Sequence, residues 1–249
     1  MLELEQQARY HQLGDTYWWL AGKYEIIMDC IAHVVPPSSM LAILDAGCGP
    51  GNMLDRLSRC GTVTGSDLAL PALRFSLGRG HRRVVLSRLD VLGLRTQRFD
   101  LVTAIDVLEH MPDDAAGLRE IHRVLRPGGT VVITVPAFEM LWGSNDEIYG
   151  HYRRYRGAQM AGLLAATGFD VIKLSYFQPL YFLPLLLFRW YRKLRSGDTD
   201  RPIAERDDFV ELPPWLNRVL TRLLAAEKYI LRRFTFPFGA TLMCVGRKQ

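Results

Sequence analysis

Three glycines at alternating positions form the strongest chemical signal in the sequence. Gly47, Gly49 and Gly51 follow the apolar residues 43–44 and precede a segment of helical character. Glycine lets the backbone approach a ligand closely, and free N–H groups at the start of a helix favour negative charge. Asp67 ends the next apolar run, 20 residues after Gly47, where a carboxylate can accept hydrogen bonds from both hydroxyls of a ribose. Together these residues predict a site for a nucleoside-containing cofactor.

The spacing of this turn separates two classes of cofactor. Dinucleotides are bound by the pattern G-x-G-x-x-G, whereas this turn has glycine at every second position and carries Asp45 two residues ahead of Gly47. A carboxylate at that place suits a ligand with an ammonium group better than a pyrophosphate. A nicotinamide-dependent dehydrogenase is therefore disfavoured.

Short apolar strands alternate with helical segments around the turn. Strands are expected at 41–44, 62–65, 84–86, 100–105, 130–135 and 171–174, and helices at 52–60, 70–77, 113–125 and 157–167. This alternation predicts an open α/β sheet of parallel strands joined by right-handed crossovers. Ligands bind such sheets at the carboxyl ends of the strands, so the residues that follow each strand are the candidates for function.

Over residues 40–175 the sequence resembles the class I S-adenosylmethionine (SAM)-dependent methyltransferases, and within them the small-molecule enzymes exemplified by ubiquinone-pathway O-methyltransferases. The similar stretches are the glycine turn, Ser66-Asp67-Leu68, Leu89-Asp90-Val91, residues 99–110 and residues 124–130. In the family the second stretch binds ribose, the third binds adenine, and the fourth lies beside the methionine end. The resemblance implies SAM as cofactor, bound by Asp45, Gly47, Cys48, Gly49, Gly51, Asp67, Leu68, Asp90, Val91, Ile105 and Asp106.

The resemblance also implies a domain plan. We expect a Rossmann-like seven-strand sheet, mostly parallel, whose last strand at 238–245 inserts antiparallel. Residues 1–40 would form an N-terminal helical lid, 41–175 the SAM-binding core, 176–236 a helical cap for substrate or membrane, and 237–249 the closing strand. Within the lid, Trp18 or Trp19 would cover the cofactor and Lys23 would meet its carboxylate. An aromatic cluster that packs the lid on the sheet explains the tryptophans equally well.

Two histidines are the candidate catalytic residues. Methyl transfer from a sulfonium needs alignment above all, and a base only where the acceptor must lose a proton. His151 is the favoured base, because it lies in a run of acidic, tyrosine and arginine residues after the fifth strand of the core. The alternative for this run is a solvated, capped loop. His110 directly follows the fourth strand, where a structural, hydrogen-bonding histidine is as well supported as a catalytic one.

The same region supplies candidates for acceptor binding. Arg153 and Arg154 can hold an anionic group, since guanidinium pairs with phosphate or carboxylate in a bidentate manner. Trp142 and Tyr152 complete the expected set. No metal site is expected. We expect methyl transfer to a small-molecule or lipid-like acceptor, at oxygen, with nitrogen or a non-catalytic SAM-binding scaffold as the alternatives.

Positive charge is concentrated in the last third of the chain. Residues 1–175 carry 18 Lys and Arg against 19 Asp and Glu, whereas residues 176–249 carry 13 against 7. This excludes a uniformly basic nucleic-acid coat. Motifs for methylation of DNA bases are also absent after the fourth strand, which reads Ile105-Asp106-Val107-Leu108. No nucleic-acid partner is expected.

Two apolar segments interrupt this basic third. The segment from Phe177 to Arg195 is rich in Leu, Phe and Tyr and ends in four cations, and three interpretations stay open: a cover for the sheet or pocket, a dimer contact, or a helix on an anionic membrane surface. Residues 215–234 predict an amphipathic helix whose apolar side holds Leu216, Val219, Leu220, Leu223, Ile230, Leu231 and Phe234. Glu227 interrupts that side, and we expect it to meet an arginine or to line the substrate cavity.

The remaining features bear on the compartment. Four cysteines lie far apart without metal-ligand spacing, so neither a disulfide framework nor a zinc site is expected and a reducing compartment fits. Glu3 and Glu5 stand where a signal peptide needs positive charge. The longest uncharged stretch, 174–188, is shorter than the roughly 20 residues of a membrane-spanning helix. We expect a cytoplasmic protein, free or peripheral on the inner membrane face; its oligomeric state is not predicted.

Overall fold

The computed structural model describes residues 16–35, 40–194 and 212–249, and its centre is one seven-stranded sheet of order β3-β2-β1-β4-β5-β7-β6. The strands are β1 (Leu41–Ala46), β2 (Gly61–Asp67), β3 (Val84–Leu86), β4 (Phe99–Ile105), β5 (Leu125–Pro136), β6 (Phe169–Phe177) and β7 (Thr241–Lys248). β7 runs antiparallel to both of its neighbours, whereas β1 to β5 pair in parallel. The predicted Rossmann-like sheet with an antiparallel last strand is therefore confirmed.

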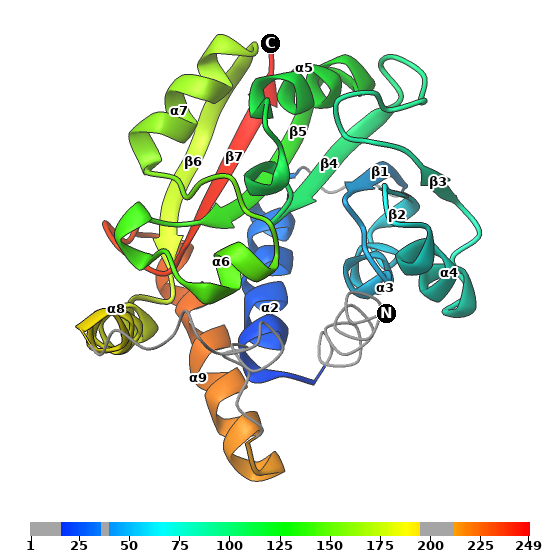
Figure 1. Ribbon diagram of the computed structural model, residues 1–249. Helices are drawn as coiled ribbons and strands as arrows, with labels where there is room; N and C mark the ends of the chain where they lie inside the picture. The colour runs from blue at the N-terminus through cyan, green and yellow to red at the C-terminus, as the bar shows by residue number, and fades with distance from the viewer. Residues whose placement is uncertain (1–15, 36–39, 195–211) are drawn as a thin grey trace.

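Helices cover both faces of this sheet (Figure 1). They are α2 (Trp18–Val34), α3 (Asn52–Leu57), α4 (Leu70–Gly78), α5 (Asp114–Val124), α6 (Ser144–Ile148), α7 (Gly157–Ala166), α8 (Pro179–Leu194) and α9 (Pro214–Leu231), with 3₁₀ turns η1 (Leu108–His110) and η2 (Glu139–Leu141). Helices α5 and α7 pack on one face, and α2, α3 and α9 pack on the other. None of the described helices is long and apolar enough to cross a bilayer.

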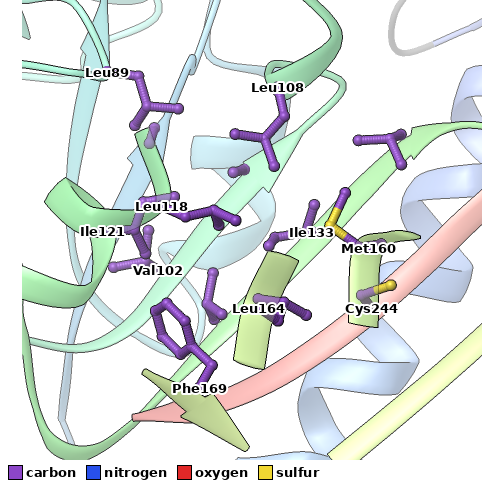
Figure 2. Packing of buried hydrophobic residues seen from close by; sticks show 14 of the residues in the cluster. Leu89, Val102, Leu108, Leu118, Ile121, Ile133, Met160, Leu164, Phe169 and Cys244 are labelled. Atoms are coloured by element: carbon purple, nitrogen blue, oxygen red, sulfur yellow. The ribbon is translucent and has the colours of Figure 1, made fainter. Parts of the chain in front are cut away.

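One large apolar cluster lies on each face of the sheet, and the alternation of side chains along the central strands produces both. Val131, Ile133 and Val135 of β5 join the cluster under α5 and α7, whereas the intervening Val132 joins the cluster under α2 and α9. Figure 2 shows Ile133 in the first cluster, with Leu118 and Ile121 of α5 and Met160 and Leu164 of α7 gathered around the sheet. A strand buried on both faces needs this continuous apolar run.

The apolar side that the sequence predicts for α9 is confirmed at Leu231 and is wrong for most of its other residues. Its buried residues are Leu224, Glu227 and Leu231, whereas Val219 and Leu223 of the predicted side are largely exposed. The reason is the packing of α9 on α2, which occurs along a different stripe. A Cβ at Gly22 of α2 would lie 2.8 Å from side-chain atoms of Leu224, so glycine at this position permits the two helices to approach closely.

Within the described part of the chain Glu227 meets no arginine, and it does not line the cavity, contrary to both expectations. Its Oε2 accepts a hydrogen bond from the backbone N–H of Gln178, at 2.7 Å. Gln178 links β6 to α8, is fully buried and has a φ of +66°. The carboxylate therefore satisfies a buried donor at the start of α8. Burial raises the pKa of Glu227 to about 7, although this hydrogen bond opposes the shift.

Candidate active site

A cavity of about 310 Å³ lies at the carboxyl ends of the parallel strands, and residues of α2, α6 and α8 line it. Figure 1 shows the places of these helices. The carboxyl ends of the strands form the edge at which open α/β sheets bind their ligands. The first turns of α2, the glycine turn after β1, the residues after β4 and the loop through α6 contribute to its wall. One side of α8 and the residues before β7 complete it.

The glycine turn is built so that its backbone forms part of the cavity wall. The N–H groups of Gly47 and Cys48 donate to the carbonyl of Ser66 at 2.7 and 2.9 Å. Gly47 has a φ of +76°, and a Cβ there would lie 2.3 Å from Val107, so only glycine fits. A Cβ at Gly49 would meet no atom within 4 Å, because it points into open space. The turn is thus closed on the protein side and open on the ligand side.

Asp45 supplies a buried carboxylate behind this turn. Its Oδ1 accepts from the hydroxyl of Thr103 at 2.6 Å, whereas its Oδ2 has no partner among the described residues. Burial raises the pKa of Asp45 to about 7, the Thr103 hydrogen bond opposes that shift, and the charge of Asp67 adds to it. A buried carboxylate oxygen without a partner is costly, so the site favours a cationic ligand. The ammonium group and sulfonium of SAM fit this requirement.

Asp67 holds the glycine turn in place. Its two carboxylate oxygens accept from the backbone N–H groups of Gly49 and Ala69, each at 2.8 Å. Burial raises the pKa of Asp67, and these hydrogen bonds lower it. A carboxylate has about four acceptor positions, so two remain for ribose hydroxyls.

Four predicted adenosine ligands lie outside the enclosed cavity. Asp67, Leu68, Asp90 and Val91 are absent from its wall. Leu68 and Val91 are exposed, and Asp90 forms hydrogen bonds of 2.9 and 2.6 Å with Arg88. The structure thus encloses the methionine end of the predicted cofactor site and leaves its adenosine end open.

Ile105 and Asp106 line the cavity where β4 ends. Asp106 forms an ion pair with Lys23 of α2 and accepts from the hydroxyl of Thr134 at 2.9 Å. Lys23 is only 1% exposed, so this pair fixes α2 to the end of β4. The cofactor contact predicted for Lys23 stays a prediction. Trp18 and Trp19 also line the cavity.

The predicted base, His151, lies in the cavity wall beside a carboxylate. Its Nδ1 is 2.8 Å from Oδ1 of Asp146, and Arg154 binds both oxygens of the same carboxylate at 2.8 and 2.9 Å. The backbone N–H of Gly143 adds a fourth hydrogen bond, at 2.8 Å. Burial alone would raise the pKa of Asp146, but the hydrogen bonds from His151 and Arg154 hold it at about 2. Asp146 is therefore ionised, and it orients the imidazole.

His110 and Glu109 face His151 across the cavity wall. The rings of His110 and His151 pack edge to face, with centroids 4.6 Å apart. Burial and the neighbouring His151 lower the pKa of His110 to about 4. Glu109 is fully buried, and neither of its carboxylate oxygens has a partner among the described residues. Burial and the charge of Asp106 hold its pKa well above the usual range.

These three side chains also form a set of donors that can hold a metal ion. One ligand atom from each of Glu109, His110 and His151 lies within 4.8 Å of the others. Two imidazoles and a carboxylate suit zinc and other transition metals. The sequence predicted no metal site because its spacing lacks a ligand motif, but this cluster joins two loops that the sheet brings together.

Three of the predicted acceptor ligands do not reach the cavity. Arg153 pairs with Asp114 at 2.9 Å and donates to the carbonyl of Pro112 at 2.6 Å, so it faces α5 instead. Tyr152 is exposed, and Trp142 is absent from the cavity wall. Arg154 lines the cavity as predicted, but its guanidinium pairs with Asp146.

Sequence reasoning missed several residues of the cavity wall. They are Glu109, Asp146, Tyr149, Tyr181, Leu185 and Arg189. Asp146 lay within the run that carries His151, and an acid five residues before a candidate base is a usable signal. Nothing in the sequence shows that Arg189 turns inward, although its guanidinium lies 3.6 Å from Asp146.

Proteins of known activity resemble this chain in sequence. Residues 44–133 match the family model described as a methyltransferase domain. These residues are thus similar to the class I SAM-dependent methyltransferase domain. Ubiquinone biosynthesis O-methyltransferase of Albidiferax ferrireducens is 32% identical over 139 residues, which are 50% of this chain and 55% of that protein. The chain thus spans about half the length of the curated relatives it matches.

Solved structures share the fold of this methyltransferase domain. The methyltransferase in complex with the Haloferax volcanii Trm112 methyltransferase activator has a TM-score of 0.63 at 19% identity, over 98% of this chain and 94% of that one. Phospholethanolamine N-methyltransferase 2 of Haemonchus contortus, in complex with phosphomonomethylethanolamine and S-adenosylhomocysteine, has a TM-score of 0.57 at 21% identity, over 89% and 52%. SAM is the methyl donor of the family, and the relatives methylate both oxygen and nitrogen.

Proposed function

We propose that this protein transfers the methyl group of SAM to a hydroxyl or other acidic oxygen of a small-molecule or lipid-like acceptor. The observation that carries the proposal is the pair of His151 and Asp146 in the wall of the cavity. A histidine fixed by an ionised carboxylate is the arrangement needed to remove a proton from an oxygen nucleophile.

The residues that would hold SAM follow from the geometry of the turn. Asp45 offers its unpartnered oxygen to the ammonium group, and the backbone at Gly49 leaves room for the methionine portion. Asp67 has acceptor positions for the ribose, and the exposed Leu68 and Val91 offer apolar surface to the adenine. When bound, SAM supplies an electrophilic methyl group on a sulfonium.

His151 would act as the general base. Since its Nδ1–H donates to Asp146, the lone pair of Nε2 is free to accept the proton of the acceptor hydroxyl. Asp146 then stabilises the imidazolium through the same hydrogen bond. His110, whose lowered pKa keeps it neutral, adds no competing positive charge near that proton. The acceptor oxygen is left with an electron pair for the in-line displacement.

Nitrogen methylation is the second candidate. It is supported by the fold shared with the N-methyltransferase of Haemonchus contortus, and an amine acceptor needs only to be unprotonated. A SAM-binding scaffold without turnover is the third. A cytoplasmic location is part of the proposal, and it is supported by four free cysteines, three of them buried.

One experiment tests the proposal. The protein is incubated with isotope-labelled SAM and an extract of metabolites and lipids, and the labelled product is analysed by mass and by methyl NMR. A labelled O-methyl product supports the proposal, an N-methyl product replaces it with the second candidate, and SAM binding without any product supports the scaffold. His151→Ala is the matched variant: it should lose turnover and keep SAM affinity, since His151 lies on the acceptor side.

A further inference from the structure

Helix α8 has two different sides. Tyr181, Leu185 and Arg189, spaced four residues apart, face the cavity and form part of its wall. Phe182 is buried against Leu141, whereas four other large apolar residues of α8 point outward. Leu180, Leu183, Leu187 and Trp190 are between 57% and 68% exposed, and their spacing of three, four and three residues makes one continuous stripe. Such a stripe is costly in water unless something covers it.

Helix α9 carries a second stripe of the same kind. Trp215, Val219 and Leu223 are each more than half exposed, and Ile230 and Phe234 continue the stripe beyond them. This is most of the side that the sequence predicts to be buried, yet of that side only Leu231 joins Leu224 in the cluster that packs on α2. Helices α8 and α9 thus each bury one apolar side and expose another.

The exposed charges that α9 and the residues just after it carry are positive, and two of them, on Lys228 and Arg232, pair with Glu25 and Asp29 of α2. Arg218, Arg222 and Arg233 are exposed, whereas the single carboxylate of this helix, Glu227, is buried against the backbone of Gln178. Exposed tryptophans and phenylalanine beside leucines and arginines are typical of helices that lie in a membrane interface. An anionic surface is complementary to this arrangement, because its negative charges attract the exposed arginines.

Both helices contact Trp18, a residue of the cavity wall. The indole of Trp18, which lines the cavity, packs edge to face on Tyr181 of α8, with centroids 5.6 Å apart. The backbone N–H of the same residue donates to the side chain of Asn217 in α9 at 2.9 Å. Helices α8 and α9 are therefore both close to the cavity wall.

We propose that the outward sides of α8 and α9 form a docking surface for an anionic lipid bilayer, from which a lipid-like acceptor reaches the cavity. The second half of this proposal rests on the proposed function, and the first half does not. The leucines and aromatic rings of both stripes would lie in the boundary between headgroups and acyl chains, with the arginines of α9 on the headgroups.

Vesicle sedimentation of the full chain tests the docking surface. Vesicles of phosphatidylcholine, with and without phosphatidylglycerol, are compared at low and raised salt. We expect sedimentation with the anionic vesicles, weakened by salt. Arg218→Ala with Arg222→Ala should weaken the partition about tenfold, and Leu183→Glu with Leu187→Glu should abolish it. Each variant must retain SAM affinity by calorimetry, which shows that it is folded.

Matched controls lie at the far edge of the sheet. Leu77→Glu replaces an exposed leucine of α4, and Arg82→Ala with Arg83→Ala removes two exposed cations before β3. These variants should sediment like the unchanged chain. The proposal is overturned if the unchanged chain ignores anionic vesicles at low salt, or if the controls lose as much binding as the α8 and α9 variants.

A second copy of the chain is the competing occupant of the stripes. It is favoured, and the bilayer overturned, if the unchanged chain is a dimer by sedimentation velocity, the α8 variant is a monomer, and neither binds vesicles. The docking surface and the proposed function fail separately. Vesicle binding without methyl transfer contradicts only the function, whereas methyl transfer without vesicle binding contradicts only the docking surface.

Discussion

Asp146 and His151 are joined by a hydrogen bond of 2.8 Å, and the same carboxylate receives both nitrogens of a bidentate Arg154. One buried anion thus fixes the orientation of the proposed base and neutralises the cation beside it. The same anion ties the N-terminal end of α6 to the segment that carries His151 and Arg154.

Replacing this anion should affect turnover more than cofactor binding. Asp146→Asn leaves the side chain in place but offers only one acceptor oxygen, so His151 loses the partner that sets its tautomer. We expect turnover to fall about 10–100-fold with SAM affinity retained. Steady-state kinetics and calorimetry measure the two effects. Arg153→Ala, outside the cavity, is the control, and equal turnover of D146N and the unchanged enzyme would remove Asp146 from the mechanism.

Asp45 should make SAM binding dependent on pH. Its pKa of about 7 means that the carboxyl is protonated below neutral pH and then no longer attracts a cation. SAM affinity should therefore fall as the pH drops from 8 to 6, and Asp45→Asn should be weaker by about tenfold or more and independent of pH in this range. Calorimetry of SAM binding between pH 6 and pH 8 measures this dependence for both proteins. A pH dependence that survives in the asparagine variant would exclude Asp45 as its source.

The same group should destabilise the ligand-free protein. The pKa of Asp45 is raised from 3.8 in the unfolded chain to about 7 in the folded one, so ionisation costs folding free energy as the pH rises through that interval. Asp45→Asn should therefore raise the melting temperature without SAM at pH 8 and have little effect near pH 4. Thermal unfolding at both pH values measures this, and a melting temperature lowered at pH 8 would contradict it.

Asp67 should be needed for the shape of the glycine turn. Asp67→Ala removes the acceptor of two backbone N–H groups as well as the predicted ribose contact. We expect SAM affinity to fall roughly 10–100-fold, since hydrogen bonds to a charged group are strong. Asp170→Ala, an exposed acid on β6, serves as the control in calorimetry. Unchanged affinity of the Asp67 variant would reject both roles.

Zinc should inhibit the enzyme. The donors of Glu109, His110 and His151 converge closely enough to hold the ion, which would occupy the nitrogen that the proposed base needs. His110→Ala should raise the inhibitory concentration, whereas His33→Ala, an exposed histidine on α2, should not. Titration with a chelator should restore turnover. Activation by zinc would instead give the cluster a metal-dependent role.

The sheet and the cofactor turn were predictable because their signals are local. The alternating glycines and the acid at the end of the following strand are required by the local backbone conformation, which does not depend on distant residues. The partners of His151 and the inward side of α8 were not predictable in this way. Arg153 and Arg154 are adjacent in sequence and lie in different surroundings, because the extended backbone between them sends one toward α5 and the other toward Asp146. The same holds for α9, where the choice of buried side depends on Gly22, some two hundred residues away in the chain.

The position of β7 has a consequence for how the chain acquires its structure. Residues 241–248 follow all other elements in sequence and yet lie between β5 and β6. Until residues 241–248 emerge from the ribosome, β5 and β6 lack the strand that pairs with both of them. The edges of these two strands then stay unpaired, and the apolar side chains beside them stay exposed. Contacts this distant in sequence slow folding and prolong the exposure of those edges. Synthesis of the final strand is therefore the step that commits the chain to a closed core, and a truncation before it should leave a species that depends on chaperones.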